Sequence, residues 1–445
     1  DNAREQVDKL TAAGADFIIL LSHSGIEEDR ILANEVEGID IILGGHDHII
    51  TPEPEIVNNT IILHSSYYLQ KVGKLELEFV RETGSVKLLN TANNTPYLIT
   101  LDSSIEEDPA IAQMIYNYGT KLNVLISEFT ENKVSNFDQV VMVSDFSLVK
   151  EADLQETTIG NFLTDAMRII GSEVTGTHVD IAFQANGVIR GDIIPGVMEW
   201  SEDKVSFLDL ATISGLGTGP DMRPGYPMVS FYLTEREVFK VLEIAALLSQ
   251  IMGDTYFLQF SGLRFTYDPN KALWLRIPFL GTPVPAYRSV INAQLFTGQG
   301  IQGEDTYIDI NPEGERLLHI VSDHYLTSFL PMIGEILPKL KLVLKDKNGN
   351  PLTIEETIIN YKGREFKVWE ALVRYSVSLE KNELGISVMP AAYQTTQGRI
   401  VAQAGTPLYI WSYSILALVI LGLALFVRWI IKAIRGRKNH VQVGN

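Results

Sequence analysis

The sequence has no cysteine among its 445 residues. This absence excludes disulfide bonds and metal sites built on thiolates, and it is compatible with an oxidising compartment without requiring one. Positive charge is also scarce, because 36 lysine and arginine residues stand against 55 aspartate and glutamate residues, giving a formal net charge of -19. This sign argues against binding to a nucleic-acid backbone. The length leaves room for about two or three domains with substantial cores.

Two histidines leave the end of a predicted strand together in the segment 39–48, IDIILGGHDH. Asp40 to Leu43 has the apolar, β-branched character of a buried parallel strand, and the two glycines after it permit bends that a side chain would resist. His46 and His48 follow one residue apart. Imidazole is the commonest side-chain metal ligand, so the pair indicates a metal site.

A third histidine follows a neighbouring predicted strand. Ala15 to Leu21 is an apolar run that leads to His23, and Glu27 to Glu37 carries apolar residues at helical spacing. This pattern predicts a strand, helix, strand unit with polar residues at the carboxyl ends of the strands. We therefore expect His23, His46 and His48 to meet at one sheet edge as metal ligands. The alternative is that each is an ordinary loop residue.

Further strands are predicted over Thr60 to Ser65 and Lys71 to Val80, the second from its alternation of apolar and charged residues. His64 lies on the first of them, and we interpret it as a buried histidine behind the site rather than as a ligand. Asp47, between the paired histidines, either orients an imidazole or faces solvent.

The motifs LSHSG and GIDIILGGHDH, at 21–25 and 38–48, resemble the last two motifs of the calcineurin-like metallophosphoesterases of the 5'-nucleotidase branch. The resemblance implies a centre of two divalent ions, Zn²⁺, Mn²⁺ or similar, that assists phosphoester hydrolysis. It also implies that His23 and His46 bind one ion and His48 the other. The expected substrates are nucleotides, 2',3'-cyclic nucleotides or other small phosphoesters.

The family's earlier motifs, Asp-x-His, Gly-Asp and Asn-His, do not occur here, and they supply its remaining ligands and its catalytic histidine. The chain opens at Asp1, within a predicted helix that carries Ala3, Val7 and Leu10. We therefore expect an amino-terminally truncated enzyme whose catalytic residues are unknown from this sequence. The chain alone is expected to be inactive.

The segment Leu408 to Val427 has twenty residues and no charge, which predicts one transmembrane helix. Residues 428–445 contain no acid and form a predicted cytoplasmic tail, so the preceding chain would lie outside the cytoplasm, in the periplasm or at the cell surface. A buried helix of a soluble core is the alternative. The basic residues of the tail are Arg428, Lys432, Arg435, Arg437 and Lys438.

The sequence predicts an α+β or α/β protein: the carboxyl-terminal part of a metallophosphoesterase β-sandwich flanked by helices, a linking helix, a mixed α/β substrate domain and one transmembrane helix. The predicted boundaries are 1–95 for the metallophosphoesterase portion, 96–139 for a linker with a helix over Asp108 to Glu131, and 140–405 for the substrate domain. Amphipathic patterns predict helices over Glu156 to Ile170 and Thr234 to Ser249, with capping threonines.

Two segments of this second domain resemble substrate-binding parts of the family. Gln184 to Ile193 resembles its NGGGIR loop, which implies roles for Asn186, Gly187 and Arg190 in binding substrate, since a guanidinium forms a planar fork of donors for phosphate. The segment 317–330, LLHIVSDHYLTSFL, is similar to the region whose aromatic residue stacks on the nucleobase, which implies that role for Tyr325. Phe257 to Pro269 resembles a strand pair with a tight turn.

Other substrate contacts of the family are replaced. Its GGDG segment is here Thr327 to Pro331, its Pro-Phe-Gly aromatic is replaced by Ser214 to Gly217, and an arginine before the opening helix is Gln155. These departures leave open a second hypothesis, a catalytically inactive, membrane-tethered binding or surface protein on a decayed phosphatase fold.

Overall fold

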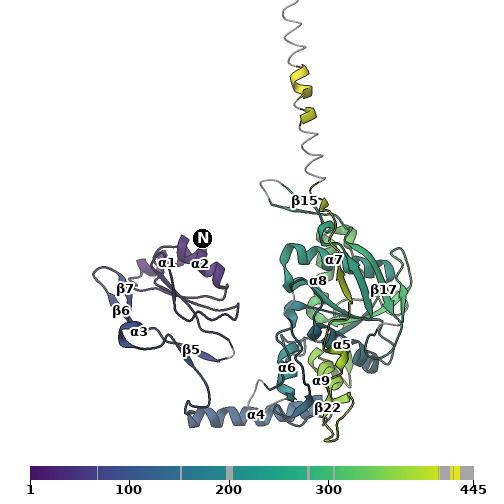
Figure 1. Cartoon of the computed structure of the whole chain (residues 1–445), viewed down its shortest axis with the longest axis horizontal. Helices are drawn as coiled ribbons and strands as arrows, with labels where there is room; N and C mark the ends of the chain where they lie inside the picture. Colours follow the sequence, from purple (N-terminus) through teal and green to yellow (C-terminus); the bar gives the residue numbers. More distant parts are fainter. Residues whose placement is uncertain are drawn as a thin grey trace, which may run out of the picture. The chain divides into compact units, whose positions relative to one another are not determined.

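The computed structural model divides into two compact units, Asp1–Tyr116 and Asn117–Asn445 (Figure 1). Helix α4 (Pro109–Phe129) contains the boundary, and the Asp108 carboxylate caps it by accepting hydrogen bonds from the first backbone N–H groups. The connecting helix predicted here is therefore confirmed. The described residues are 1–67, 69–150, 153–196, 204–277, 281–303, 306–408, 410, 421–423 and 425–430.

A four-stranded sheet forms the centre of unit 1, with strands in the order β1-β2-β4-β3. Its first three strands are parallel, so the loops after their carboxyl ends leave at one edge. The predicted strand, helix, strand unit is confirmed, and α1 and α2 bury Val7 and Ala33 against Ile42 and Ile62. The bounds are α1 (Asn2–Ala12), β1 (Ile19–Leu21), α2 (Ile26–Glu35), β2 (Ile41–Gly44), β3 (Glu55–Val57) and β4 (Thr60–His64).

The single strand predicted over Lys71 to Val80 is wrong. The segment forms two strands, β5 (Lys71–Gly73) and β6 (Leu77–Val80), which pair with β8 (Leu98–Thr100) and β7 (Ser85–Leu88) in separate sheets. The break follows from the buried amide of Asn90, at the start of α3 (Asn90–Asn93). It accepts a hydrogen bond from the backbone N–H of Glu76 and donates one to the carbonyl of Lys74.

Unit 2 is built on a sheet with the order β12-β19-β10-β13, in which β10 and β19 are parallel. Because residues alternate between faces along a strand, Ala182 of β10 packs with α5 while Ile181 and Phe183 pack with α7. The two helices therefore cover opposite faces. The bounds are α5 (Thr158–Thr175), β10 (Ile181–Ala185), β12 (Met228–Thr234), α7 (Glu235–Met252), β13 (Leu258–Ser261) and β19 (Leu317–Asp323).

Both helices begin where the capping residues indicate. The Thr157 hydroxyl accepts a hydrogen bond from the N–H of Gly160, and Thr234 and Glu237 form a reciprocal capping box. Such caps satisfy backbone donors that have no partner within the helix. The two predicted amphipathic helices are confirmed.

A second sheet of unit 2 has the order β18-β17-β14-β23. The strand pair predicted over Phe257 to Pro269 is wrong in one respect, because β13 and β14 belong to different sheets. Gly262, with φ of 85°, turns the chain between them, and a Cβ there would lie 1.8 Å from the carbonyl oxygen of Asp180. The bounds are β14 (Leu263–Tyr267), β17 (Val290–Phe296), β18 (Tyr307–Asp309) and β23 (Ile400–Ala402).

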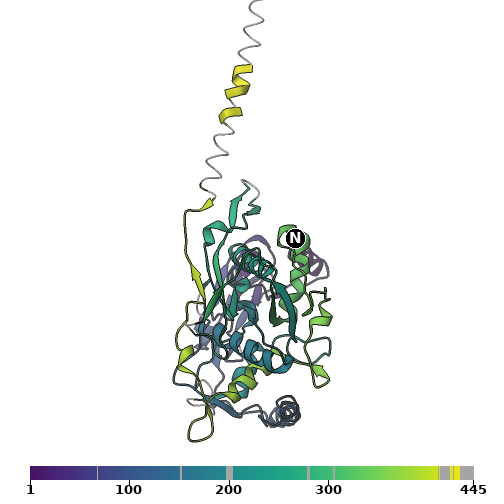
Figure 2. The same cartoon turned by 90° about the vertical axis from the view of Figure 1, so that its right-hand side faces the viewer.

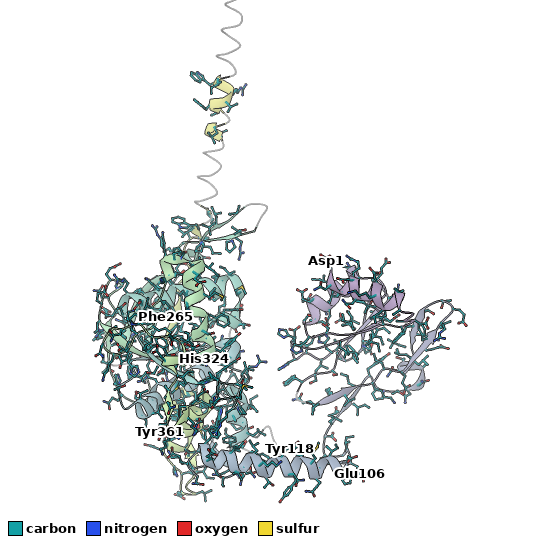
Figure 3. All side chains as sticks on the ribbon, turned by 180° about the vertical axis from the view of Figure 1, so that it is seen from behind. Asp1, Glu106, Tyr118, Phe265, His324 and Tyr361 are labelled. Carbon is teal, nitrogen blue, oxygen red and sulfur yellow. The ribbon has the colours of Figure 1, made fainter. Side chains whose placement is uncertain are left out.

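The side chain of Phe265 on β14 (Figure 3) lies in a core formed by residues of both sheets. A third sheet of unit 2 has the order β11-β9-β22, and β15-β16 and β20-β21 form two-stranded sheets. The bounds of the remaining elements are β9 (Val140–Val143), β11 (Lys204–Ser206), α6 (Phe207–Ser214), β15 (Leu273–Arg276), β16 (Pro283–Pro285), α8 (His324–Ile336), β20 (Asn360–Tyr361), β21 (Arg364–Glu365), α9 (Val368–Ser378) and β22 (Ser387–Val388).

The predicted transmembrane segment 408–427 lies for the most part outside the described residues. Within the described ranges, no helix combines the length and the apolar character that crossing a bilayer requires.

Candidate functional site

His23 and His46 face each other in unit 1, in the loops after the parallel strands β1 and β2. Their ring centroids lie 5.2 Å apart, edge to face. Gly45 permits this approach, because a Cβ on it would lie 3.1 Å from Nδ1 of His23. His46 has φ of 90°, a backbone conformation that residues with a side chain rarely adopt. Such strain persists where the surrounding structure enforces it, and it concentrates at functional sites.

The structure brings together two of the three predicted metal ligands. His48 stacks on Tyr67, with ring centroids 4.9 Å apart and planes inclined by 13°. Among the residues that the structure describes, no group of three or more His, Cys, Asp or Glu side chains is arranged to hold a metal ion.

A buried network is joined to the His23 loop through Ser22. The His64 Nε2 and Asp29 Oδ2 atoms are 2.8 Å apart, the Ser22 hydroxyl donates to the other oxygen of Asp29, and both His64 and Asp29 are buried. Gly44 lies against them so closely that a Cβ would come within 1.9 Å of His64 Nε2. His64 is thus a buried residue bonded to an aspartate, as predicted, and the network fixes the start of the His23 loop.

The pair His23 and His46 fits part of a metal donor set, since neutral imidazole nitrogens bind zinc and manganese. Divalent ions of this kind also favour anionic oxygens. Two carboxylates from the same segments are already bonded: Asp29 binds His64, and Asp47 Oδ2 accepts a hydrogen bond from the N–H of Ile26 at the start of α2. Asp47 therefore caps a helix.

A second group of polar residues lies in unit 2, in the loop after β10. Asn186 is buried, donates to both carboxylate oxygens of Asp254 at 3.0 and 3.1 Å, and accepts from Gln259 Nε2. A Cβ on Gly187 would lie 2.4 Å from Cγ2 of Thr255. Two of the predicted substrate residues, Asn186 and Gly187, therefore hold the loop in shape, and Arg190 is its exposed member.

Lys150 adds a second cation beside Arg190. Its Nζ donates to the carbonyl of Ile189 at 3.1 Å, and its backbone N–H donates to Asp192. Burial lowers the pKa of Lys150, with Arg190 acting in the same direction and Asp254 and Asp192 opposing it. Sequence reasoning missed Lys150 because it lies forty residues before the loop it joins, outside any recognised motif.

Tyr325, at the start of α8, stacks on Tyr226 with ring centroids 5.0 Å apart and planes inclined by 16°. The backbone N–H of Tyr226 donates to the carbonyl of Leu216, and a Cβ on Gly217 would lie 2.3 Å from the Tyr226 ring. Tyr226 thus packs over the segment Ser214 to Gly217, which lacks the family's aromatic residue. The ring that stacks on Tyr325 is thus that of Tyr226, nine residues beyond the end of this segment.

Asp323, the last residue of β19, is a buried acid close to this tyrosine pair. Its Oδ1 accepts a hydrogen bond from the N–H of Leu326 at 2.5 Å and caps α8. Its Oδ2 and the hydroxyl of Thr327 are buried with no hydrogen-bond partner among the described residues. Burial raises the pKa of Asp323 to about 6.

The raised pKa of Asp323 predicts a pH-dependent gain from Asp323→Asn. The folded protein binds this proton more tightly than the unfolded chain, so stability is lost as pH rises from about 4 to about 6. Asparagine cannot ionise, but its side-chain oxygen can still accept the hydrogen bond that caps α8. We expect the variant to exceed the parent in free energy of unfolding by about 3 kcal/mol at pH 7.5 and by little at pH 4. Denaturant titrations at both pH values measure this, and an equal difference at both would contradict it.

Comparison with known proteins relates residues 135–308 to the 5'-nucleotidase C-terminal domain. The chain is 26% identical over 344 residues to the trifunctional nucleotide phosphoesterase protein YfkN of Bacillus subtilis, covering 74% of this chain and 21% of that protein. It is 29% identical over 392 residues to a 5'-nucleotidase of Diplobatis ommata, covering 81% of this chain and 62% of that one. It thus spans only part of the length of these relatives.

Two solved structures share the fold. A 5'-nucleotidase precursor from Thermus thermophilus superposes with a TM-score of 0.56 at 21% identity, covering 91% of this chain and 67% of that chain. The sulfate thiohydrolase SoxB of Thermus thermophilus superposes with a TM-score of 0.51 at 18% identity, covering 91% and 58%. The mixed α/β architecture of this chain therefore matches that of 5'-nucleotidase structures.

Proposed function

We propose that this chain is part of a metal-dependent hydrolase that cleaves nucleotides or related small phosphoesters. The observation that carries the proposal is the arrangement in unit 2, where Arg190 and Tyr325 follow the carboxyl ends of the parallel strands β10 and β19. Lys150 bonds to the loop that carries Arg190, and Tyr226 stacks on Tyr325. Lys150 and Arg190 offer positive charge to a phosphate, while Tyr325 and Tyr226 offer a flat apolar surface to a base. Ligands bind at this edge of many α/β sheets.

The metal part of the proposal rests on unit 1. His23 and His46 would hold one divalent ion, zinc, manganese or similar, and His48 would hold the second. Bound ions of this kind lower the pKa of water to near neutrality and neutralise charge on phosphoryl oxygens. The network of Ser22, Asp29 and His64 fixes the backbone from which the His23 side chain extends.

In unit 2 each side chain has a distinct binding role. Arg190 presents a planar fork of N–H donors that matches two phosphate oxygens, whereas Lys150 contributes a single positive charge. Stacking on Tyr325 tolerates different bases, which fits a substrate range of several nucleotides.

This assignment predicts that Arg190→Ala and Lys150→Ala each weaken binding of adenosine monophosphate by about tenfold, the loss of one charge-assisted hydrogen bond. Arg190→Lys should recover only part of the affinity because the fork is lost. Titration calorimetry of the folded chain measures the dissociation constants. Lys133→Ala, at an exposed lysine far along the chain from this loop, is the control. If all four variants bind adenosine monophosphate with equal affinity, Lys150 and Arg190 do not contribute to substrate binding.

A second candidate function is a tethered binding protein without turnover. The helix α8 runs through Thr327 to Pro331, where the family's GGDG segment would be, which favours this alternative. Substrate binding without hydrolysis in the metal-loaded protein, with all its segments present, would support it over the enzyme.

The location is also a proposal: a single membrane span over 408–427, with the preceding chain at the periplasmic or outer cell surface and the basic tail in the cytoplasm. The charge-free run and the basic residues after it support this orientation.

A further inference from the structure

The hairpin of β15 and β16 lies next to the point where the chain leaves the fold of unit 2 (Figures 1 and 2). Both backbone polar groups of Gly405 are hydrogen-bonded. Its N–H donates to Asp268 Oδ1 at 3.1 Å, and its carbonyl accepts a hydrogen bond from Asn270 Nδ2 at 2.7 Å. A Cβ on Gly405 would lie 2.6 Å from Asp268 Oδ2, so the chain is held closely there. Only two residues separate Gly405 from the apolar run that begins at Leu408.

The outer surface of this hairpin combines aromatic, apolar and cationic side chains. Trp274 and Ile277 are 36% and 38% exposed, and the guanidinium of Arg288 lies 5.2 Å from the centre of the Trp274 ring. Arg276 is exposed as well and donates to the carbonyl of Gln250 at 3.4 Å. Tryptophan is enriched at membrane–water interfaces, and the arginine guanidinium matches phosphate oxygens such as those of lipid headgroups.

Acidic residues are absent from the sequence of the hairpin and of the chain after it leaves the fold, although the protein contains 55 acidic residues. No aspartate or glutamate occurs from Pro269 to Gly303, a stretch with three basic residues, and none follows Glu383 to the end of the sequence. The acids that border the hairpin are engaged: Asp268 is buried, and Glu243 accepts hydrogen bonds from the N–H groups of Ser289 and Val290. The hairpin itself therefore carries no negative charge that would repel an anionic surface.

The composition of β16 argues against another protein strand as the partner that covers this hairpin. β16 is Pro-Val-Pro, and proline has no N–H to donate to an added strand. A two-stranded hairpin of this size is marginal alone and gains from contact with a further surface. The composition of the hairpin therefore favours a partner surface that does not require hydrogen bonds from the backbone.

We propose that the β15–β16 hairpin rests in the interface of an anionic lipid bilayer, with Trp274 and Ile277 among the lipid headgroups and Arg276 and Arg288 against lipid phosphates. The inference depends on the proposed membrane span at 408–427, which would bring the hairpin to the bilayer. The hairpin then fixes the tilt of unit 2 on the membrane.

Because the chain has no cysteine, one introduced cysteine gives a unique labelling site. The full chain carrying Ile277→Cys and a nitroxide is reconstituted in vesicles of phosphatidylcholine and phosphatidylglycerol. Collision rates with oxygen and with a water-soluble nickel chelate report lipid exposure. The control is Leu384→Cys, at an apolar side chain that is 81% exposed near β22, away from β15 (Figure 1).

We expect the ratio of oxygen to nickel collisions to be several-fold higher at position 277 than at 384. Adding Arg276→Gln and Arg288→Gln should lower the ratio at 277 towards that of the control. Equal ratios in a chain that floats with the vesicles would overturn the docking and leave the span intact. If the chain does not float with the vesicles, both the membrane span and the docking of the hairpin are overturned. None of these outcomes tests the proposed hydrolysis.

Discussion

Replacing Asp165 by asparagine is expected to lower the free energy of unfolding of unit 2 by about 3–5 kcal/mol. Asp165 and Arg399 are fully buried and joined by two hydrogen bonds of 2.9 and 2.8 Å, and the hydroxyl of Tyr393 donates to the same carboxylate at 2.9 Å. Asparagine would leave the Arg399 guanidinium buried without its anion. Uncompensated buried charge is among the most destabilising changes that a single substitution produces.

Denaturant titration of the full chain measures this loss, with Glu315→Gln as the matched control. Glu315 pairs with Arg236 at 2.5 Å, and both side chains are about half exposed. Exposed pairs contribute about 0–1 kcal/mol, so the control should be nearly neutral. If both variants unfold at similar denaturant concentrations, the Asp165 network does not contribute the 3–5 kcal/mol of stability, roughly, that its burial implies.

Replacing His46 by alanine is expected to reduce phosphoester hydrolysis by about a thousandfold in the complete, metal-loaded protein, equivalent to about 4 kcal/mol of lost transition-state stabilisation. The reason is loss of one of two imidazoles that face each other across 5.2 Å. Calorimetric titration of the chain with Mn²⁺ or Zn²⁺ gives a readout independent of turnover, and binding should weaken markedly.

The control is His178→Ala, since His178 lies in unit 2 with a half-exposed side chain. It should leave metal binding and hydrolysis unchanged. Undiminished metal affinity in the His46 variant would show that the pair does not serve as a ligand set, whatever rate of hydrolysis is measured.

The parts of the fold that sequence analysis predicted correctly are those with local signals. The capping box of Thr234 and Glu237 defines the start of α7 within four residues of sequence, and the apolar runs before His23 and His46 define β1 and β2. These features depend on neighbours in the chain and are readable without the tertiary structure.

The errors and omissions depend on residues far apart in sequence. The break between β5 and β6 requires Asn90, fourteen residues beyond Glu76, and the stacking of Tyr226 on Tyr325 joins residues almost a hundred positions apart. Lys150 approaches Arg190 only because the chain folds back over the β10 loop. No periodicity or motif encodes such contacts.

The pairing of β23 with β14 determines how the fold responds to mechanical force. Three residues of β23, from Ile400 to Ala402, pair in register with Phe265 to Tyr267, and the buried Arg399 precedes them. A pull on the chain beyond Gly405 loads first the hydrogen bonds of Gly405 to Asp268 and Asn270, and then the paired residues of β23. Tension from a moving attachment point would therefore be borne by the edge of the sheet before it reached the loops that we propose bind substrate.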